Sequence, residues 1–288
     1  MTALTAAGPG VRRPVTVGRV LGVIGIVLLI LIEVVPLIWL FLSSLKAPAE
    51  FSSKPMWALP DGLFLQNYVE AWTRGNMARY ILNSALATFP AIVILIVTGL
   101  AAGFALEVLK WRGRGGVLLL FLAGLMVPLQ MILLPLFAIY VKVGLLNSPL
   151  ALVLTYAATG LPLTVFMMAG YYRSLPREII ESAIIDGASI YRVFFSISLP
   201  MLRNAILTIA VVQFFFFWND LLFALTFTTD NDSRTIQAGL LNFVGTFGQT
   251  EWGPTFASIC ISIVPTLAIY LLLNQRVMSG LADGAVKG

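Results

Sequence analysis

Long apolar runs are the feature of this sequence that most restricts its fold. The first extends from Val20 to Leu42, and Glu33 is its only charged residue. A membrane-spanning helix needs roughly 20 mostly apolar residues, whereas the core of a signal peptide has about 7 to 15. The run therefore predicts a retained transmembrane helix. The composition agrees, because 59% of the chain is hydrophobic and only 11% is charged, against about a quarter charged in soluble domains.

Six such runs divide the chain, so we expect an all-α membrane protein with six transmembrane helices. A short basic tail, residues 1–19, precedes one transmembrane domain over residues 20–288. The predicted spans cover about 20–42, 80–106, 116–141, 149–172, 204–228 and 255–275.

The distribution of lysine and arginine predicts the orientation of these spans. Twelve of the 18 basic residues lie in the N-terminal tail, in 107–115, in 173–203 and in the C-terminal tail, and six lie in the alternate segments. Cytoplasmic loops are enriched in Lys and Arg. We therefore expect both termini in the cytoplasm, and the long loops 43–79 and 229–254 outside, where each is either a solvated linker or a binding element.

Several kinds of chemistry have no residues to support them. The sequence has no histidine, and its one cysteine, Cys260, lies in an apolar run. Histidine-based metal sites and bases are thereby excluded, as is a disulfide framework. No G-x4-G-K-[S/T] phosphate loop occurs either. We expect no enzyme activity, no metal and no cofactor in this chain.

The charged segment 173–203 interrupts the apolar pattern. Pro176 suits the first turn of a helix, and Gly187 suits the left-handed residue just beyond its end. Over 176–187 most isoleucines share one arc and the acidic residues the opposite arc. This pattern predicts a short amphipathic helix that does not span. A second short helix, with Ser189 as N-cap, should follow and break at Leu199-Pro200.

The spacing within this segment also resembles a known motif. Glu181-Ser182-Ala183, Gly187 and Ile197-Ser198-Leu199-Pro200 follow the pattern E-A-A-x3-G-x9-I-x-L-P, except that serine replaces the second alanine. The pattern is the EAA loop of binding-protein-dependent ABC transporter permeases. Further short matches extend the resemblance over residues 20–288, to the MalG type of the carbohydrate-uptake family. They are Ser44-Leu45-Lys46, Asn83-Ser84, Trp218-Asn219-Asp220 and the terminal Gly284-Ala285-Val286-Lys287-Gly288.

The resemblance implies a MetI-like permease core in a bacterial cytoplasmic membrane, importing a mono- or oligosaccharide. It implies a paralogous MalF-type permease, two subunits that bind ATP-Mg, and an extracytoplasmic solute-binding protein as partners. In such permeases the EAA loop forms a coupling helix that fits a cleft of the ATPase. The residues that this carries over are Glu181, Ser182, Ala183, Asp186, Gly187, Ala188, Leu199 and Pro200.

Polar residues within the predicted spans are candidates for the translocation path, because ionisable groups in a membrane are costly. Asn219 and Asp220 follow Trp218 in the fifth span, and amides and carboxylates beside an aromatic ring suit a sugar. Helix packing is the competing interpretation. Gln130, in the third span, is a further candidate. Glu33 fits either a hydrogen-bonded carboxyl facing a neighbouring helix or a substrate contact.

Two other functional classes are compatible with six spans. An ion-coupled secondary carrier should show two related halves with interrupted helices at matching positions, and no such repeat is visible. A membrane enzyme needs a catalytic set of residues, which the sequence does not supply. The sequence does not specify which solute is carried.

Overall fold

The computed structural model describes residues 17–245 and 250–285, where the regular structure is helical apart from one antiparallel bridge between Val244 and Thr250. The longer helices are α1 (Val17–Ser44), α4 (Met77–Glu107), α5 (Arg114–Leu125), α6 (Leu129–Val143), α7 (Pro149–Ser174), α11 (Arg203–Trp218) and α14 (Trp252–Ala285). The shorter α-helices are α2 (Pro48–Ser53), α3 (Gln66–Thr73), α8 (Arg177–Ile185), α9 (Ile190–Arg192), α10 (Leu199–Met201), α12 (Leu222–Phe227) and α13 (Ile236–Gly239). A π-helical turn, η1, covers Val193–Ser198, and the 3-10 turns η2 and η3 cover Asn231–Ser233 and Leu240–Phe243.

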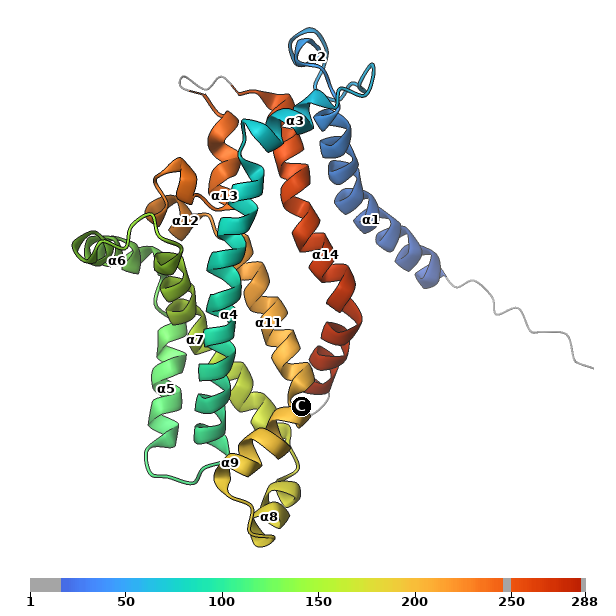
Figure 1. Ribbon diagram of the computed structural model, residues 1–288. Coiled ribbons are helices and arrows are strands. Elements are labelled where there is room, and N and C mark those ends of the chain that lie inside the picture. Colours follow the sequence, from blue (N-terminus) through green and yellow to red (C-terminus); the bar gives the residue numbers. More distant parts are fainter. Residues whose placement is uncertain (1–16, 246–249, 286–288) are drawn as a thin grey trace, which may run out of the picture.

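The centre of the bundle is formed by α4, α7, α11 and α14 (Figure 1). Close packing of α4 on α7 depends on two glycines four residues apart. A Cβ added to Gly99 would lie 2.4 Å from Thr164, and one added to Gly103 would lie 2.9 Å from Met168. Small residues at this spacing let membrane helices approach closely. This pair forms the scaffold on which the other elements are placed.

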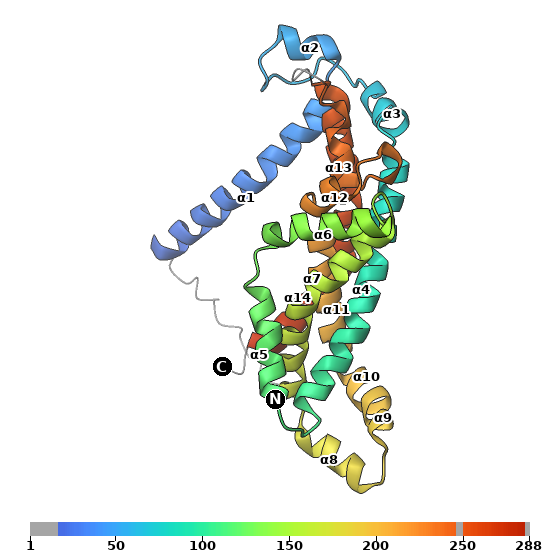
Figure 2. The ribbon, with the colours of Figure 1, turned by 90° about the vertical axis from the view of Figure 1, so that its left-hand side faces the viewer.

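Four described helices are long and apolar enough to cross a membrane, namely α1, α4, α7 and α14. They correspond to four of the six predicted spans. Two bent pairs bring the number to as many as six if each pair counts as one span. Helix α1 stands apart from the bundle except at its end near α2 and α14 (Figure 2).

The third predicted span, 116–141, is not one continuous helix, and this prediction needs correction. Helices α5 and α6 meet at an angle of 92°, and α6 lies across the bundle (Figure 2). Residues that precede a proline are disfavoured in the helical conformation, and Pro128 itself is extended, with ψ 125°. The 12 residues of α5 extend about 18 Å, well short of a bilayer core of roughly 30 Å.

The fifth predicted span, 204–228, is also wrong as a continuous helix, since α11 ends at Trp218 and α12 begins at Leu222. The expected break at Leu199-Pro200 is displaced too. Pro200 lies inside the single turn α10, where its missing N–H is tolerated because it is in a first turn. The chain bends by 71° between the segment Ile190–Met201 and α11.

Segment 43–79 is a folded cap rather than an open linker. Asn67 is buried and donates from Nδ2 to the carbonyl oxygens of Ser44 and Lys46, both at 2.8 Å. Glu50 accepts the N–H of Ala47 at 2.9 Å, and this bond lowers the pKa of the carboxyl group. An ion pair between Arg74 and Glu251, at 3.0 Å, joins the cap to the start of α14.

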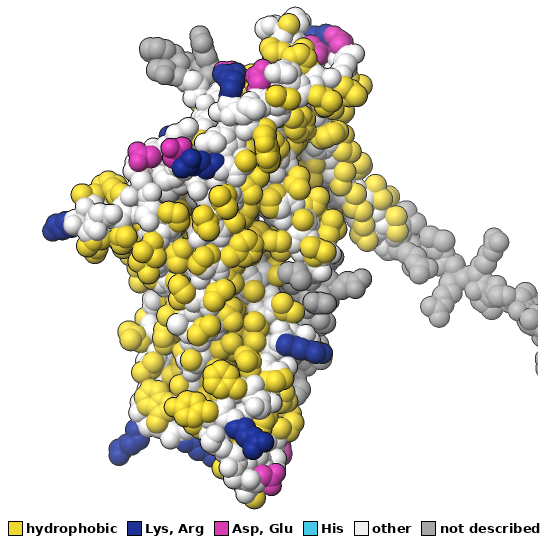
Figure 3. All heavy atoms as spheres, in the orientation of Figure 1, with side chains coloured by type: hydrophobic (Ala, Val, Ile, Leu, Met, Phe, Trp, Pro, Cys, Tyr) yellow, Lys and Arg dark blue, Asp and Glu magenta, His cyan; other side chains and the backbone are white. Residues whose placement is uncertain are grey.

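The two predicted outside loops therefore lie at one end of the bundle. The turn between α4 and α5 lies with α8 and α9 at the opposite end (Figure 1). This placement agrees with the expected alternation of the loops. On the face drawn in Figure 3, apolar side chains cover the middle of the bundle, while most charged side chains lie toward its two ends.

Candidate functional site

Helix α8 lies at the end of the bundle farthest from the cap, and its sequence determines both of its ends. Pro176 precedes the first turn, and Gly187 has a φ of +80° just beyond the last one. The N–H of Ala188 bonds to the carbonyl of Ala183 at 2.9 Å, and that of Gly187 bonds to Ile184 at 3.0 Å. This pair of bonds is a Schellman cap, in which glycine tolerates the left-handed position. The expected amphipathic helix and its glycine end are both present.

The segment after Gly187 ties α8 back to the membrane helices. Ser189 caps α9 by accepting the N–H of Arg192. The following turns bury Val193 and Leu202 against Phe104 and Met168 in one apolar cluster. This buried return segment holds α8 at a set position beneath α4 and α7.

The residues of this loop that the family resemblance assigns to ATPase coupling divide into two groups. Ala183, Ala188 and Leu199 are half-buried against the same apolar cluster, so they contact this chain itself. The exposed group contains Glu181, Ser182, Asp186, Gly187 and Pro200. Within the described part of the chain, Glu181 makes no ion pair or hydrogen bond.

Large apolar side chains also project from this loop. Ile185 is 84% exposed, Tyr191 74% and Phe195 60%. Ile185 lies on α8 itself, next in sequence to the exposed carboxylate of Asp186. Exposed apolar patches rimmed by polar residues mark sites of protein or membrane interaction.

The second group of candidate residues lies at the break between α11 and α12. The carboxylate of Asp220 accepts the hydroxyl of Tyr156 at 3.0 Å and the N–H groups of Ala224 at 3.1 Å and Phe223 at 3.4 Å. An aspartate that accepts backbone N–H groups in this way begins a new helix rather than continuing the old one. Asp220 therefore accounts for the break, and its charge meets three donors within the protein.

The neighbours of Asp220 have different surroundings. Trp218 is buried and stacks on Phe214, with ring centroids 5.2 Å apart, so its ring does not face a channel. Asn219 is exposed and accepts a hydrogen bond from Gln237 at 3.2 Å. Of the Trp218-Asn219-Asp220 set, Asp220 borders a cavity between α7 and α11, and the other two residues do not border it.

That cavity, of about 300 Å³, is bordered by α5, α7, α11 and the start of α12. Gln213 lines it together with Tyr156 and Asp220, and sequence reasoning missed both Gln213 and Tyr156. The amide of Gln213 donates to the Gly160 carbonyl at 3.1 Å and to Thr164 at 3.0 Å. Gln213 lies seven residues before Asp220, two helical turns along the same face, which was the available signal.

Gln130 and Glu33 are not part of this arrangement. Gln130 is exposed near the start of α6 and does not border the cavity. Glu33 is exposed on α1, and no described residue bonds to it. The expected partner on a neighbouring helix is therefore not found among the described residues.

Comparison with known proteins decides the family. Residues 95–277 match the family described as "Binding-protein-dependent transport system inner membrane component". The chain belongs to this family. The matched region covers α7, α8, α11 and the 173–203 loop. Membership in a family of ABC permeases does not favour the ion-coupled carrier, and it is a transport family rather than an enzyme family.

Curated relatives align over most of the permease. A diacetylchitobiose uptake permease of Streptomyces coelicolor, NgcG, is 33% identical over 89% of this chain and 85% of its own length. A trehalose/maltose transport permease of Thermococcus litoralis, MalG, is 32% identical over 94% and 97%. A solved bacterial ABC transporter for alginate import matches with a TM-score of 0.78 and 19% identity, over 93% and 99%. That structure supports the helical permease fold alone.

Proposed function

We propose that this chain is a permease subunit of an ATP-driven importer that moves a mono- or oligosaccharide across the cytoplasmic membrane of a bacterium. The family match carries the proposal, and the names of the relatives support the substrate class. NgcG and MalG are named for diacetylchitobiose and for trehalose and maltose. A further relative, from Bacillus subtilis and 30% identical, is named for melibiose, raffinose and stachyose import.

The geometry of α8 supports a role in coupling to an ATPase. The helix projects from the end of the bundle and is held there by the buried return segment. It exposes Glu181, Asp186 and Ile185. An unpaired carboxylate beside exposed apolar side chains suits docking into a cleft of a second protein, where charge-assisted hydrogen bonds are strong. The 173–203 loop is thus our candidate for the contact through which ATP hydrolysis drives transport.

The partners follow from this assignment. Two subunits would bind ATP-Mg and hydrolyse it, and a paralogous MalF-type permease would complete the membrane portion. An extracytoplasmic solute-binding protein would dock on the end formed by the cap and segment 229–254, which we place outside. Residues 1–16 and 286–288, which we expect in the cytoplasm, lie outside the described residues.

The cavity at Asp220 is our candidate for part of the translocation path. It combines the carboxylate with the phenol of Tyr156, the amide of Gln213 and the rings of Phe216 and Phe217. Hydrogen-bonding groups next to aromatic faces complement a sugar, which has a hydroxyl rim and an apolar face. Gln130, Trp218 and Asn219 are weaker candidates, because they do not border this cavity.

Co-expression with the ATP-binding subunits and the second permease tests the coupling role. Glu181→Ala and Glu181→Lys should leave this chain in the membrane but reduce recovery of the ATPase or uncouple hydrolysis from uptake. Glu178→Ala, which removes an exposed carboxylate one turn earlier on α8, is the matched control. Normal ATPase recovery and normal uptake in both Glu181 variants would remove α8 as the coupling element.

A further inference from the structure

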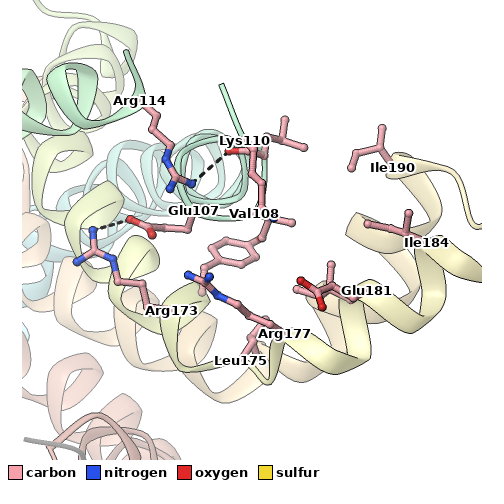
Figure 4. Close-up of a pocket in the computed structure, with 13 residues that line it drawn as sticks. Glu107, Val108, Lys110, Arg114, Arg173, Leu175, Arg177, Glu181, Ile184 and Ile190 are labelled. Atoms are coloured by element: carbon pink, nitrogen blue, oxygen red, sulfur yellow. Dashed lines mark hydrogen bonds and ion pairs between the residues drawn. The ribbon is translucent and has the colours of Figure 1, made fainter. Parts of the chain in front are cut away.

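A second cavity lies between α8 and the turn that joins α4 to α5. Its volume is about 330 Å³, and its walls come from four segments: the end of α4 with the turn into α5, the end of α7, α8, and the start of α9. Figure 4 shows Arg114 and Arg177 extending toward this space from opposite sides. The cavity is distinct from the one at Asp220, with which it shares no lining residue.

The lining carries more positive than negative charge. Four cations, Lys110, Arg114, Arg173 and Arg177, face two carboxylates, Glu107 and Glu181. Arg173 and Glu107 form an ion pair at 2.5 Å and so neutralise each other.

Of the remaining three cations, only Arg114 bonds to another residue in the described structure. Arg114 donates to the Leu109 carbonyl at 3.5 Å, a long hydrogen bond. Lys110 and Arg177 have no hydrogen bond or ion pair to any described residue. Glu181 alone opposes these three positive groups, and it lies beyond ion-pair distance of each.

Tyr172 supplies an independent observation. Its side chain lines the cavity and is only 3% exposed, yet its hydroxyl has no hydrogen-bond partner. Buried hydroxyl groups are normally hydrogen-bonded, and leaving one unsatisfied is costly. The hydroxyl oxygen itself is enclosed, so it reaches a ligand in the cavity when the Tyr172 ring turns toward the cations, and an anion held there would supply the missing partner.

We propose that this cavity binds a phosphate group, carried either by an anionic lipid headgroup or by a small soluble phosphate ester. Guanidinium groups match phosphate oxygens in geometry and charge, and the Tyr172 hydroxyl can donate a further bond once its ring turns into the cavity. Apolar side chains, such as Val108, Leu175 and Ile180, line the cavity between the charged groups. These side chains suit the carbon portion of an ester rather than a free inorganic ion.

The position of the site gives it a consequence for α8. Arg177 and Glu181 belong to α8, whereas Lys110 and Arg114 belong to the opposite wall. A bound phosphate draws Arg177 toward the α4–α5 turn and fixes the angle of α8 to the bundle. This regulatory consequence rests on the proposed coupling role of α8, but the binding itself does not.

Binding can be measured on the full chain, purified in mild detergent, by native mass spectrometry. Phosphatidylglycerol is titrated against phosphatidylcholine with the same acyl chains. A second arm titrates glycerol 1-phosphate and glucose 6-phosphate by calorimetry. The test variants are Lys110→Gln with Arg177→Gln, and Tyr172→Phe, which removes only the hydroxyl. Arg112→Gln and Arg192→Gln are the controls, since both cations are exposed and neither lines the cavity.

We expect one class of phosphate probe to bind the unaltered chain. Loss of each charge-assisted contact should weaken binding of that probe about tenfold, and Tyr172→Phe should weaken it several-fold. The control variants should bind the probe as tightly as the unaltered chain. Binding of phosphatidylglycerol alone identifies a lipid headgroup, and binding of the soluble esters identifies a small ligand.

The proposal is overturned if no phosphate probe binds, or if Arg112→Gln or Arg192→Gln weakens binding as much as the test variants. Should the double variant fail to fold, the single variants Lys110→Gln and Arg177→Gln still decide, because both side chains are exposed and line the cavity. Gly187→Leu serves to separate this inference from the proposed function, because Gly187 lies at the end of α8 but does not line the cavity, so a failure of coupling there leaves the phosphate titration unaffected.

Discussion

Gly187 gives the sharpest test of whether α8 docks into another subunit. Its φ of +80° lies in the left-handed region, and nothing in the described structure lies within 4 Å of a Cβ built on it. A side chain here therefore has a backbone cost but no steric cost within this chain. That cost is about 1 to 2 kcal/mol for a residue other than glycine.

Gly187→Ala and Gly187→Leu should consequently destabilise the isolated permease equally. Their unfolding midpoints in detergent should agree closely, because both pay the same backbone cost and the Cβ that they share meets no neighbour. In the assembled transporter the two variants should differ. If α8 enters a cleft, the three further carbons of leucine must displace the partner, and overpacking costs typically 1 to 3 kcal/mol. We expect ATPase association and sugar uptake to fall at least several-fold further for leucine than for alanine.

Gly144 is the matched control. It ends α6 with a φ of +69° and also has nothing within 4 Å of its Cβ position, but α6 lies well away from α8 along the bundle (Figure 2). Gly144→Leu should affect ATPase association no more than Gly144→Ala. Equal association and uptake for the two Gly187 variants would refute docking at the end of α8. A difference between their midpoints in the isolated chain would refute the steric argument.

Three further outcomes are expected. A cysteine at Ser53 should react with an impermeant thiol reagent in intact cells, whereas one at Ser189 should react only after lysis; the opposite pattern would invert the topology. Asp220→Asn should reduce uptake only mildly. Asp220→Leu removes the cap of α12 at a cost of about 1 to 2 kcal/mol, and it should impair uptake but not assembly. If the leucine variant fails to co-purify with the other subunits, Asp220 serves helix packing instead. Glu107→Arg and Arg173→Glu should each reduce uptake, because the ion pair at 2.5 Å joins the end of α4 to the residues before α8. The double variant, in which the two charges are exchanged, should recover uptake. No recovery in the double variant would show that the pair does not position α8.

Local chemistry made much of α8 and its surroundings predictable. Proline and glycine bias the backbone at their own positions, so Pro176 and Gly187 marked both ends of the helix before any contact was known. Ser189 marked the next helix in the same way. The spans α1, α4, α7 and α14 were predictable because a bilayer requires a minimum length of apolar helix, which hydropathy records directly.

The bent pairs were not predictable from hydropathy, because an apolar run has the same composition whether or not its axis turns. At Pro128 a local signal is present, but a proline in an apolar run does not by itself distinguish a loosened helix from a 92° bend. At Asp220 the break depends on a hydrogen bond from Tyr156, 64 positions away in the chain. The sequence could suggest a polar site there, but not which donors would meet it.

By itself the sequence determined the membrane class, the four long spans, the family and the ends of α8, since each depends on neighbours in the chain. Only the tertiary structure decided which polar groups share a space. It brought Gln213 and Tyr156 to Asp220 and left Gln130 apart. It also turned Ala183 and Ala188 toward the bundle, and set Lys110 and Arg114 opposite Arg177. Those placements depend on how α4 and α7 pack and where α8 is anchored. Contacts between residues far apart in the sequence leave no periodic pattern along the chain from which they could be predicted.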